Sequence, residues 1–223
     1  MLAALRARQP GEPLRRVLWW HCLHFLCFLW MTLCYRHRFW GHHHIPRYGP
    51  VLLVSNHQSL FDPILVGLGS HHRQFFAMAR STLFAHRVFA WLIRSLNAIP
   101  IARGTSDLRA LRMCIDVLTR EQAMLVFPEG TRTRDGAAGV FKTGVMLLVK
   151  RARPRVVPVA IEGAFSAWPH GRQLPRATGR IAVMYGEPIE ADTLIAMGEA
   201  AALVHLHDTI EAMRQELSRR LRR

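Results

Sequence analysis

Acidic residues and lysines are scarce in this sequence of 223 residues. It contains 15 Asp and Glu against 30 Lys and Arg, and Lys142 and Lys150 are its only lysines. The formal charge of +15 therefore comes almost entirely from arginine. Because guanidinium groups bind phosphate in a bidentate manner, this excess favours an anionic partner. Nucleic acid, an anionic membrane surface and a phosphorylated substrate all remain open at this point.

Several kinds of site are also missing. Four cysteines without any C-x-x-C pair are too few for a disulfide scaffold, so we expect reduced thiols and a cytosolic environment. The sequence lacks a Walker loop, a G-x-G-x-x-G loop and a G-x-S-x-G elbow, which gives no support to nucleotide binding or to a Ser-His-Asp hydrolase. The triplet His42–His44 stands without a Cys or carboxylate at ligand spacing, so a solvated loop is expected there and not a metal site.

Hydrophobic residues make up half of the chain, and the mean hydropathy is +0.08. A disordered basic tail would lack these apolar residues, and a polytopic membrane protein would contain several apolar spans. The length suits one globular domain, or one domain with a small appendage. We expect residues 1–45 to form a basic lead with a hydrophobic helix, and residues 46–223 to form the globular domain.

The segment Val17–Tyr35 carries no formal charge over nineteen residues. A secretory signal is not expected, because small residues do not follow the apolar stretch. The length just suffices for a membrane span, but His21 and His24 interrupt it and arginines flank both ends, so the positive-inside rule gives conflicting orders. A helix lying in one leaflet, with its tryptophans at headgroup depth, resolves this conflict and is the favoured interpretation. A single span and a buried helix remain as alternatives.

After Pro50 the sequence alternates between short apolar runs and helical patterns, which indicates an α/β domain. We predict a mixed, largely parallel sheet flanked by helices. Several of the runs are apolar at successive positions, as central strands of a covered sheet are. The predicted strands are Val51–Ser55, Gln74–Ala79, Ala98–Ile101, Ala123–Phe127, Val156–Ile161 and Ile181–Tyr185. Leucine and isoleucine stripes predict helices near residues 108–118 and 203–221.

Polar clusters follow three of these predicted strands, at the edge of the sheet where α/β proteins keep their sites. His57 and Asp62 follow the first strand, and a turn leading into a helix at Asp62-Pro63 would bring the two side chains together. A carboxylate bonded to one ring nitrogen makes the other nitrogen a better base. On spacing alone, two residues that merely cap a loop are the better interpretation.

The second cluster runs from Phe127 to Gly136. It offers a turn glycine, a threonine hydroxyl and arginines that could clamp an anion. The third is Arg103-Gly104, just beyond the strand that ends at Ile101.

These clusters carry a family resemblance. Asn56-His57 with Asp62 resembles the N-H-x-x-x-x-D motif of the glycerolipid acyltransferases, typified by 1-acyl-sn-glycerol-3-phosphate acyltransferases. Phe127–Arg132 resembles their second hallmark, F-P-E-G-T-R. Ile99–Gly104, Val157–Ile161 and Gly186–Ile189 are similar to the remaining motifs, in the family's order.

The resemblance implies a reaction. His57 would be the general base on an acceptor hydroxyl and Asp62 would orient it, with direct attack of the hydroxyl on an acyl thioester. No metal or tightly bound cofactor would be needed, because the thioester already supplies a good leaving group. Arg103 and Arg132 would hold the acceptor's phosphate, while Glu129, Gly130 and Thr131 would shape the site. Lys142 could reach an anionic group of either substrate. Pro158 and its neighbours would line the acyl or donor side or belong to the core.

The implied partners are a lysophospholipid acceptor, most simply lysophosphatidate, an acyl-CoA or acyl carrier protein donor, and an anionic membrane surface. The expected location is the cytoplasmic face of the cell membrane, monotopic or single-span. A different lyso-lipid, such as an aminolipid or glycolipid, is the first alternative acceptor. A basic nucleic-acid-binding module is the alternative from another class, but it gives no role to Glu129 or to the uncharged helix.

Overall fold

The computed structural model describes residues 13–101 and 108–223. Its helices are α2 (Leu14–Tyr35), α3 (Asp62–Gly69), α4 (Arg87–Ser95), α5 (Leu108–Thr119), α6 (Gly144–Ala152), α7 (Ala164–Ala167), α8 (Ala191–Met197) and α9 (Glu199–Arg222), with 3-10 turns η1 (His42–His44) and η2 (Ser81–Phe84). Its strands are β1 (Arg38–Trp40), β2 (Val51–Ser55), β3 (Phe75–Arg80), β4 (Ala98–Ile101), β5 (Ala123–Val126), β6 (Arg155–Glu162) and β7 (Ala182–Tyr185).

The described strands form one sheet in the order β1-β7-β6-β2-β5-β3-β4. All neighbouring pairs are parallel except β6 and β7, which run antiparallel. The α/β class with a largely parallel sheet is therefore confirmed. The sequence missed β1, because three residues are too few to show a period, and it missed α4, α6, α7 and α8.

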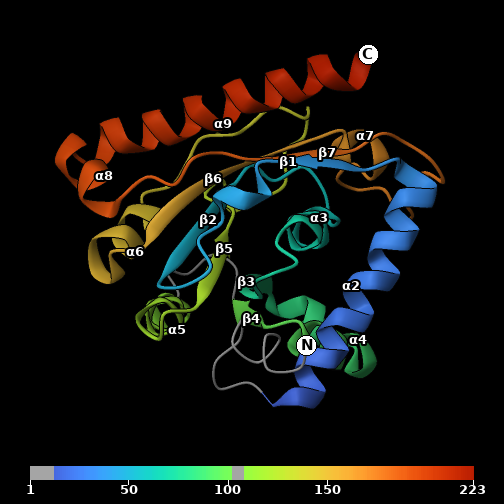
Figure 1. Cartoon of the computed structure of the whole chain (residues 1–223), viewed down its shortest axis with the longest axis horizontal. Helices are drawn as coiled ribbons and strands as arrows, with labels where there is room; N and C mark the ends of the chain where they lie inside the picture. Colours follow the sequence, from blue (N-terminus) through green and yellow to red (C-terminus); the bar gives the residue numbers. More distant parts are fainter. Residues whose placement is uncertain (1–12, 102–107) are drawn as a thin grey trace.

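Helices cover both faces of the sheet (Figure 1). Successive residues of a strand point to opposite faces, and β2 shows this directly. Leu52 and Val54 pack with α5, α6 and α9, while Val51 and Leu53 pack with α2 and α3. Strand β2 is buried throughout, as its unbroken apolar sequence predicts for a central strand.

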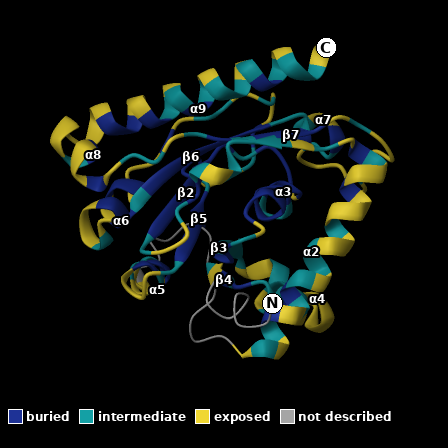
Figure 2. Cartoon of the chain, in the orientation of Figure 1, coloured by how far each residue is buried: buried dark blue, intermediate teal, exposed yellow. Residues whose placement is uncertain are grey.

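Helix α2 is bound to the domain by a narrow stripe. Its buried residues are Val17, Trp20, Met31 and Tyr35, and the Tyr35 hydroxyl donates a 2.6 Å hydrogen bond to the carbonyl of Arg176. Most of its other apolar side chains face outward, including Phe25, Leu26, Leu29 and Leu33. Figure 2 shows the outer surface of α2 as largely exposed. In the described part of the chain, α2 is the helix long and apolar enough to cross a membrane, and the alternative of a buried helix is wrong.

The parallel pairing fixes where the site lies. Val54 of β2 is in register with Val126 of β5, and β6 pairs with β2 on the other side. The segments that follow these strands therefore leave the sheet at one common edge. His57, Glu129 and Glu162 all lie there.

Candidate active site

Asp62 lies at the first position of α3, followed by Pro63, as the sequence predicted. The turn before it folds back so that one carboxylate oxygen, Oδ2, accepts three hydrogen bonds. The donors are His57 Nδ1 at 2.7 Å, the Gln58 backbone N–H at 2.6 Å and the Ser59 backbone N–H at 2.8 Å. Asp62 is fully buried. The carboxylate is thus held in one orientation by the backbone itself.

This geometry fixes the tautomer of His57. A carboxylate oxygen only accepts hydrogen bonds, so Nδ1 carries the proton and Nε2 keeps its lone pair. The imidazole stacks on Phe127 with ring centroids 4.0 Å apart and planes 15° apart. Its side chain is 19% exposed while that of Asp62 is 0% exposed. His57 is therefore the member of the pair that an external molecule can reach.

The loop after β5 is attached to the backbone of this same turn. Glu129 Oε1 accepts the His57 backbone N–H at 2.9 Å, and the Thr133 backbone N–H donates to the His57 carbonyl at 2.8 Å. Glu129 is buried, and this burial raises the pKa of its carboxyl, partly opposed by the His57 and Gly139 backbone N–H groups. Glu129 thus contacts the main chain of His57 and positions it.

Gly130 makes the tight turn of this loop. Its N–H donates to the Phe127 carbonyl at 3.0 Å, and its φ of +71° lies in the left-handed region that glycine adopts without strain. A Cβ at this position would lie 2.7 Å from Lys142 Nζ. The amine of Lys142 therefore lies directly against the turn, so the F-P-E-G-T-R loop has a cation beside it in addition to its own Arg132.

For the remaining predicted site residues that it describes, the structure gives the exposure and the element or loop in which they lie. Thr131 is exposed and Arg132 is half-buried on the same loop. Arg103 lies outside the described residues; it follows β4, which runs parallel to β3 in the same sheet. Pro158 lies in β6 and is buried. The structure thus places it in the core, which was one of the two expectations.

Asn56 and Gln58 are functional candidates that the sequence did not single out by role. Asn56 Oδ1 accepts from the Ile161 N–H at 2.8 Å and its Nδ2 donates to the Ile161 carbonyl at 2.9 Å, so its amide continues the pairing of β2 with β6. Buried Gln58 donates to the Gly136 carbonyl at 2.8 Å and accepts from the Phe165 N–H at 3.2 Å. The N-H-x-x-x-x-D motif was the signal for Asn56, whereas Gln58 occupies a position that this motif leaves unspecified.

A polar pocket of about 220 Å³ adjoins Gln58. Its charged lining residues are Asp135, Glu162 and Arg214, so two carboxylates face one guanidinium. Arg214 lies on α9 and forms 2.7 Å ion pairs with Glu162 and Glu211. The hydrogen bond from Arg214 lowers the pKa of Glu211. In a chain of +15, this pocket carries a negative formal charge.

The histidine triplet forms η1, and its rings are directed to different neighbours. His44 Nδ1 contacts the Tyr185 carbonyl at 2.9 Å, and the His42 ring lies edge-on to that of Phe39. Within residues 13–101 and 108–223, no group of three or more His, Cys, Asp or Glu is arranged to hold a metal.

Comparison with known proteins agrees with the motifs. The chain is 29% identical over 182 residues to the chloroplast 1-acyl-sn-glycerol-3-phosphate acyltransferase of Arabidopsis thaliana, covering 77% of this chain and 50% of that protein. It is 32% identical over 165 residues to the lyso-ornithine lipid O-acyltransferase of Pseudomonas aeruginosa, covering 71% and 59%. The chain thus spans about half the length of the first of these relatives.

The fold is likewise similar to a solved structure. The crystal structure of the 1-acyl-sn-glycerophosphate acyltransferase PlsC from Thermotoga maritima superposes with a TM-score of 0.78 at 25% identity, covering 96% of this chain and 86% of that one. Residues 36–162 match the sequence profile of the family described as Acyltransferase. That match spans more than half of the chain and includes both hallmark motifs, so the chain belongs to the acyltransferase family.

Proposed function

We propose that this protein transfers a fatty acyl group from an acyl thioester to the free hydroxyl of a lysophospholipid, with 1-acyl-sn-glycerol-3-phosphate as acceptor and phosphatidic acid as product. The observation that carries the proposal is the 2.7 Å contact between His57 Nδ1 and Asp62 Oδ2, which leaves Nε2 as a base beside the F-P-E-G-T-R loop. The acceptor follows from the arginines of the motifs and from the Arabidopsis relative.

The reaction needs one base and one good leaving group. His57 Nε2 takes the proton of the acceptor hydroxyl while the oxygen attacks the thioester carbonyl. The tetrahedral intermediate collapses with cleavage of the C–S bond, and the departing thiolate recovers the proton from the imidazolium. Asp62 stabilises that imidazolium. The acyl group passes directly from sulfur to oxygen without an acyl-enzyme.

The acceptor's phosphate would be held by cations next to this base. We assign Arg103 and Arg132 to it, with Thr131 and the Gly130 backbone forming the adjacent wall. Lys142 supports the assignment, because its amine lies against Gly130. Glu129 acts on this site indirectly, by holding the main chain of His57 and the loop together.

The membrane would supply the acceptor. We assign residues 1–45 to membrane attachment and residues 46–223 to catalysis. The exposed apolar side of α2 would lie in one leaflet of the cytoplasmic face of the cell membrane, where acyl-CoA and acyl carrier protein are available as donors.

The test is turnover of lysophosphatidate with a labelled acyl thioester by the purified full-length chain. His57→Ala should lower kcat by about 100-fold or more, as expected for loss of a general base. His205→Ala is the matched control, because His205 is an exposed histidine of α9. Turnover by His57→Ala equal to that of the control would refute the mechanism, and no diacyl product from the native protein would refute the function.

A second acceptor is favoured by one specific observation. The pocket beside Gln58 carries Asp135 and Glu162 against one arginine, which suits a cationic headgroup. The Pseudomonas relative acts on a lyso-ornithine lipid, whose headgroup carries an amine. The alternative proposal is therefore acyl transfer to a lyso-aminolipid by the same His57 and Asp62.

The kinetics of two variants, measured with each acceptor in turn, distinguish the proposals. With lysophosphatidate as the substrate, Arg103→Ala should raise the acceptor KM strongly and Asp135→Asn should leave it unchanged. With a lyso-aminolipid as the substrate, the pattern should be reversed. The acceptor with the higher kcat/KM for the native protein identifies the substrate class.

A further inference from the structure

A second basic site lies where α2 ends, at a pocket of about 100 Å³ that is lined almost entirely by arginine. Three segments far apart in the sequence build it: the residues after α2, the residue before Ile181, and the end of α9. Figure 1 shows the C-terminal ends of α2 and α9 on the same side of the molecule. The lining residues are Arg36, Arg38, Arg180, Arg220, Leu221 and Arg223.

The base of this pocket is fixed by main-chain hydrogen bonds. The N–H of Arg38 donates to the Ile181 carbonyl at 3.0 Å, and the N–H of Ile181 donates to the Tyr35 carbonyl at 3.2 Å. Arg180 Nη1 donates to the Leu221 carbonyl at 3.0 Å, which ties the end of α9 to the same place. The arginines are therefore brought together by the fold and do not merely share a surface.

The charge of this group is only partly balanced. Glu216 forms 2.8 Å ion pairs with Arg219 and Arg220, and the Arg220 guanidinium lies over the Trp40 ring at 5.1 Å. The other lining arginines, Arg36, Arg38, Arg180 and Arg223, are exposed. Like charges held together repel each other, and an anion bound between them removes that repulsion. Guanidinium groups in this number match the oxygens of a phosphate.

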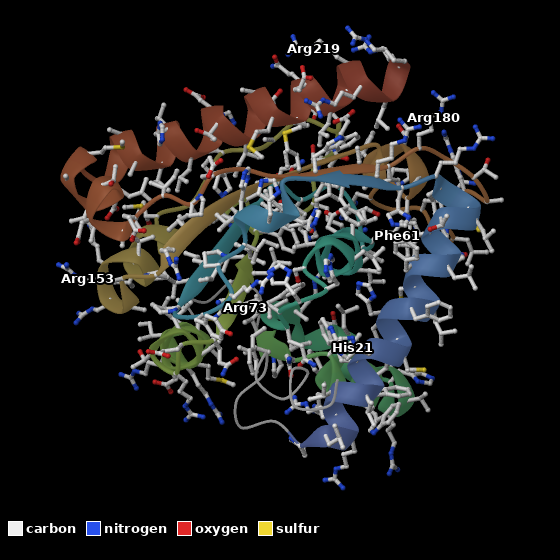
Figure 3. The ribbon with its side chains drawn as sticks, in the orientation of Figure 1. His21, Phe61, Arg73, Arg153, Arg180 and Arg219 are labelled. Atoms are coloured by element: carbon white, nitrogen blue, oxygen red, sulfur yellow. The ribbon has the colours of Figure 1, made fainter. Side chains whose placement is uncertain are left out.

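The exposed apolar side of α2 shows which phosphate this would be. Phe25 is 63% exposed and Leu33, one turn before the pocket, is 73% exposed. Figure 3 shows Arg180 beside the end of α2 and Arg219 near the end of α9. Apolar side chains thus lead directly to a group of arginines, which is the order of acyl chain and headgroup in a bilayer leaflet.

We propose that this pocket binds the phosphate of an anionic membrane phospholipid, at a site separate from the His57 site. The bound headgroup would join α2, the edge of the sheet and α9, and would fix how the domain is oriented on the membrane.

The test uses the full-length chain in neutral detergent micelles, titrated with short-chain phosphatidylglycerol and followed by native mass spectrometry. This lipid is neither acceptor nor product of the proposed reaction, so the result does not depend on the proposed function. Short-chain phosphatidylcholine and inorganic phosphate are the comparison ligands. Hydrogen exchange of residues 36–38 and 179–181 reports where the lipid binds.

Arg38→Ala/Arg180→Ala should weaken phosphatidylglycerol binding about thirtyfold, since one arginine at an anionic surface contributes roughly a fivefold factor. Turnover should stay within about twofold of the native value, since neither arginine touches the His57 site. Arg120→Ala/Arg151→Ala is the matched control, because it removes two exposed arginines beyond the pocket. Its binding should be unchanged.

Arg38→Lys/Arg180→Lys keeps the charge and loses the bidentate geometry, so it should still bind several-fold more weakly than the native protein. Should the alanine pair fail to fold, this lysine pair decides the question. Native affinity in the lysine pair would show diffuse attraction and overturn the proposal. So would displacement of the lipid by inorganic phosphate at equal concentration, because the pocket would then be a site for a soluble ion.

Discussion

Asp62→Asn tests most directly whether the carboxylate orients the imidazole of His57, the proposed general base. Asparagine is isosteric with aspartate, and its side-chain oxygen can occupy the place of Oδ2 and still accept from His57, Gln58 and Ser59. Its amide group must then occupy the place of Oδ1, which is buried without a hydrogen-bond partner in the part of the chain that the structure describes. The variant therefore keeps the shape of the turn and removes its charge.

The expected change in the free energy of unfolding follows from these contacts. Hydrogen bonds to a charged group contribute about 1 kcal/mol more than neutral ones, so three of them lose about 3 kcal/mol, and the unpaired amide costs about 1–3 kcal/mol more. Removing a buried charge also removes its desolvation cost, which offsets several kcal/mol. We expect a net loss of about 2 kcal/mol in the free energy of unfolding. The kcat should fall by about 10²–10⁴-fold, because the imidazolium loses its counter-charge.

The assay measures denaturant unfolding and the turnover of lysophosphatidate with a labelled acyl thioester on the same preparation, with turnover expressed per folded molecule. Asp116→Asn is the control, because Asp116 is exposed on α5, and it should change neither quantity. Turnover of Asp62→Asn within about tenfold of the native value would refute the reasoning, since a general base that works without its carboxylate does not need it.

Three further results are expected. Burial raises the pKa of the Glu129 carboxyl above its ordinary value of 4.5, so ionising it in the folded protein costs stability as the pH rises past that value. Glu129→Gln should therefore become more stable relative to the native protein from about pH 4.5 upward. Denaturant unfolding of both proteins across pH measures this, and a constant difference in their free energies of unfolding would contradict it. Gly130→Ala should lower both activity and the thermal midpoint, whereas Gly171→Ala, with a similar φ of +88° but open space around it, should lower only the midpoint. Burial raises the pKa of Cys114 to about 12, so mass spectrometry after brief maleimide treatment should find the exposed Cys22 labelled and Cys114 unmodified; early labelling of Cys114 would show that the core opens there.

Local patterns predicted most of the elements around the site. The unbroken apolar run gave β2 with the observed bounds, and Asp62-Pro63 gave the start of α3, because both signals involve neighbouring residues. Spacing alone favoured residues that merely cap a loop at His57 and Asp62, and only the resemblance of the motifs indicated that the two side chains pair. The structure brings them to 2.7 Å, and the catalytic roles remain predictions.

Contacts between distant segments had no comparable signal. Gln58 is tied to the backbones of Gly136 and Phe165, about eighty and one hundred residues away, and one sequence alone carries no pattern that records such a pairing. The arginines around Arg180 likewise come from three separate segments. Their individual positions were visible in the sequence, but their convergence depends on strand β1. A strand of three residues is too short to be predicted from its pattern.

The pairing of β1 with β7 has a consequence for the order in which the protein folds. Arg38 is in register with Ala182, so the two partners lie more than 140 residues apart. Closing so long a loop is entropically slow, and the strands between β2 and β6 can pair before it closes. Since β1 directly follows α2, the end of this helix at Tyr35 is fixed against the sheet only in that step, whereas its first turns contact Phe75 and Ser95, which lie much closer in the sequence. The two ends of α2 are therefore expected to be fixed at different stages of folding, its start together with β3 and α4 and its end together with β7.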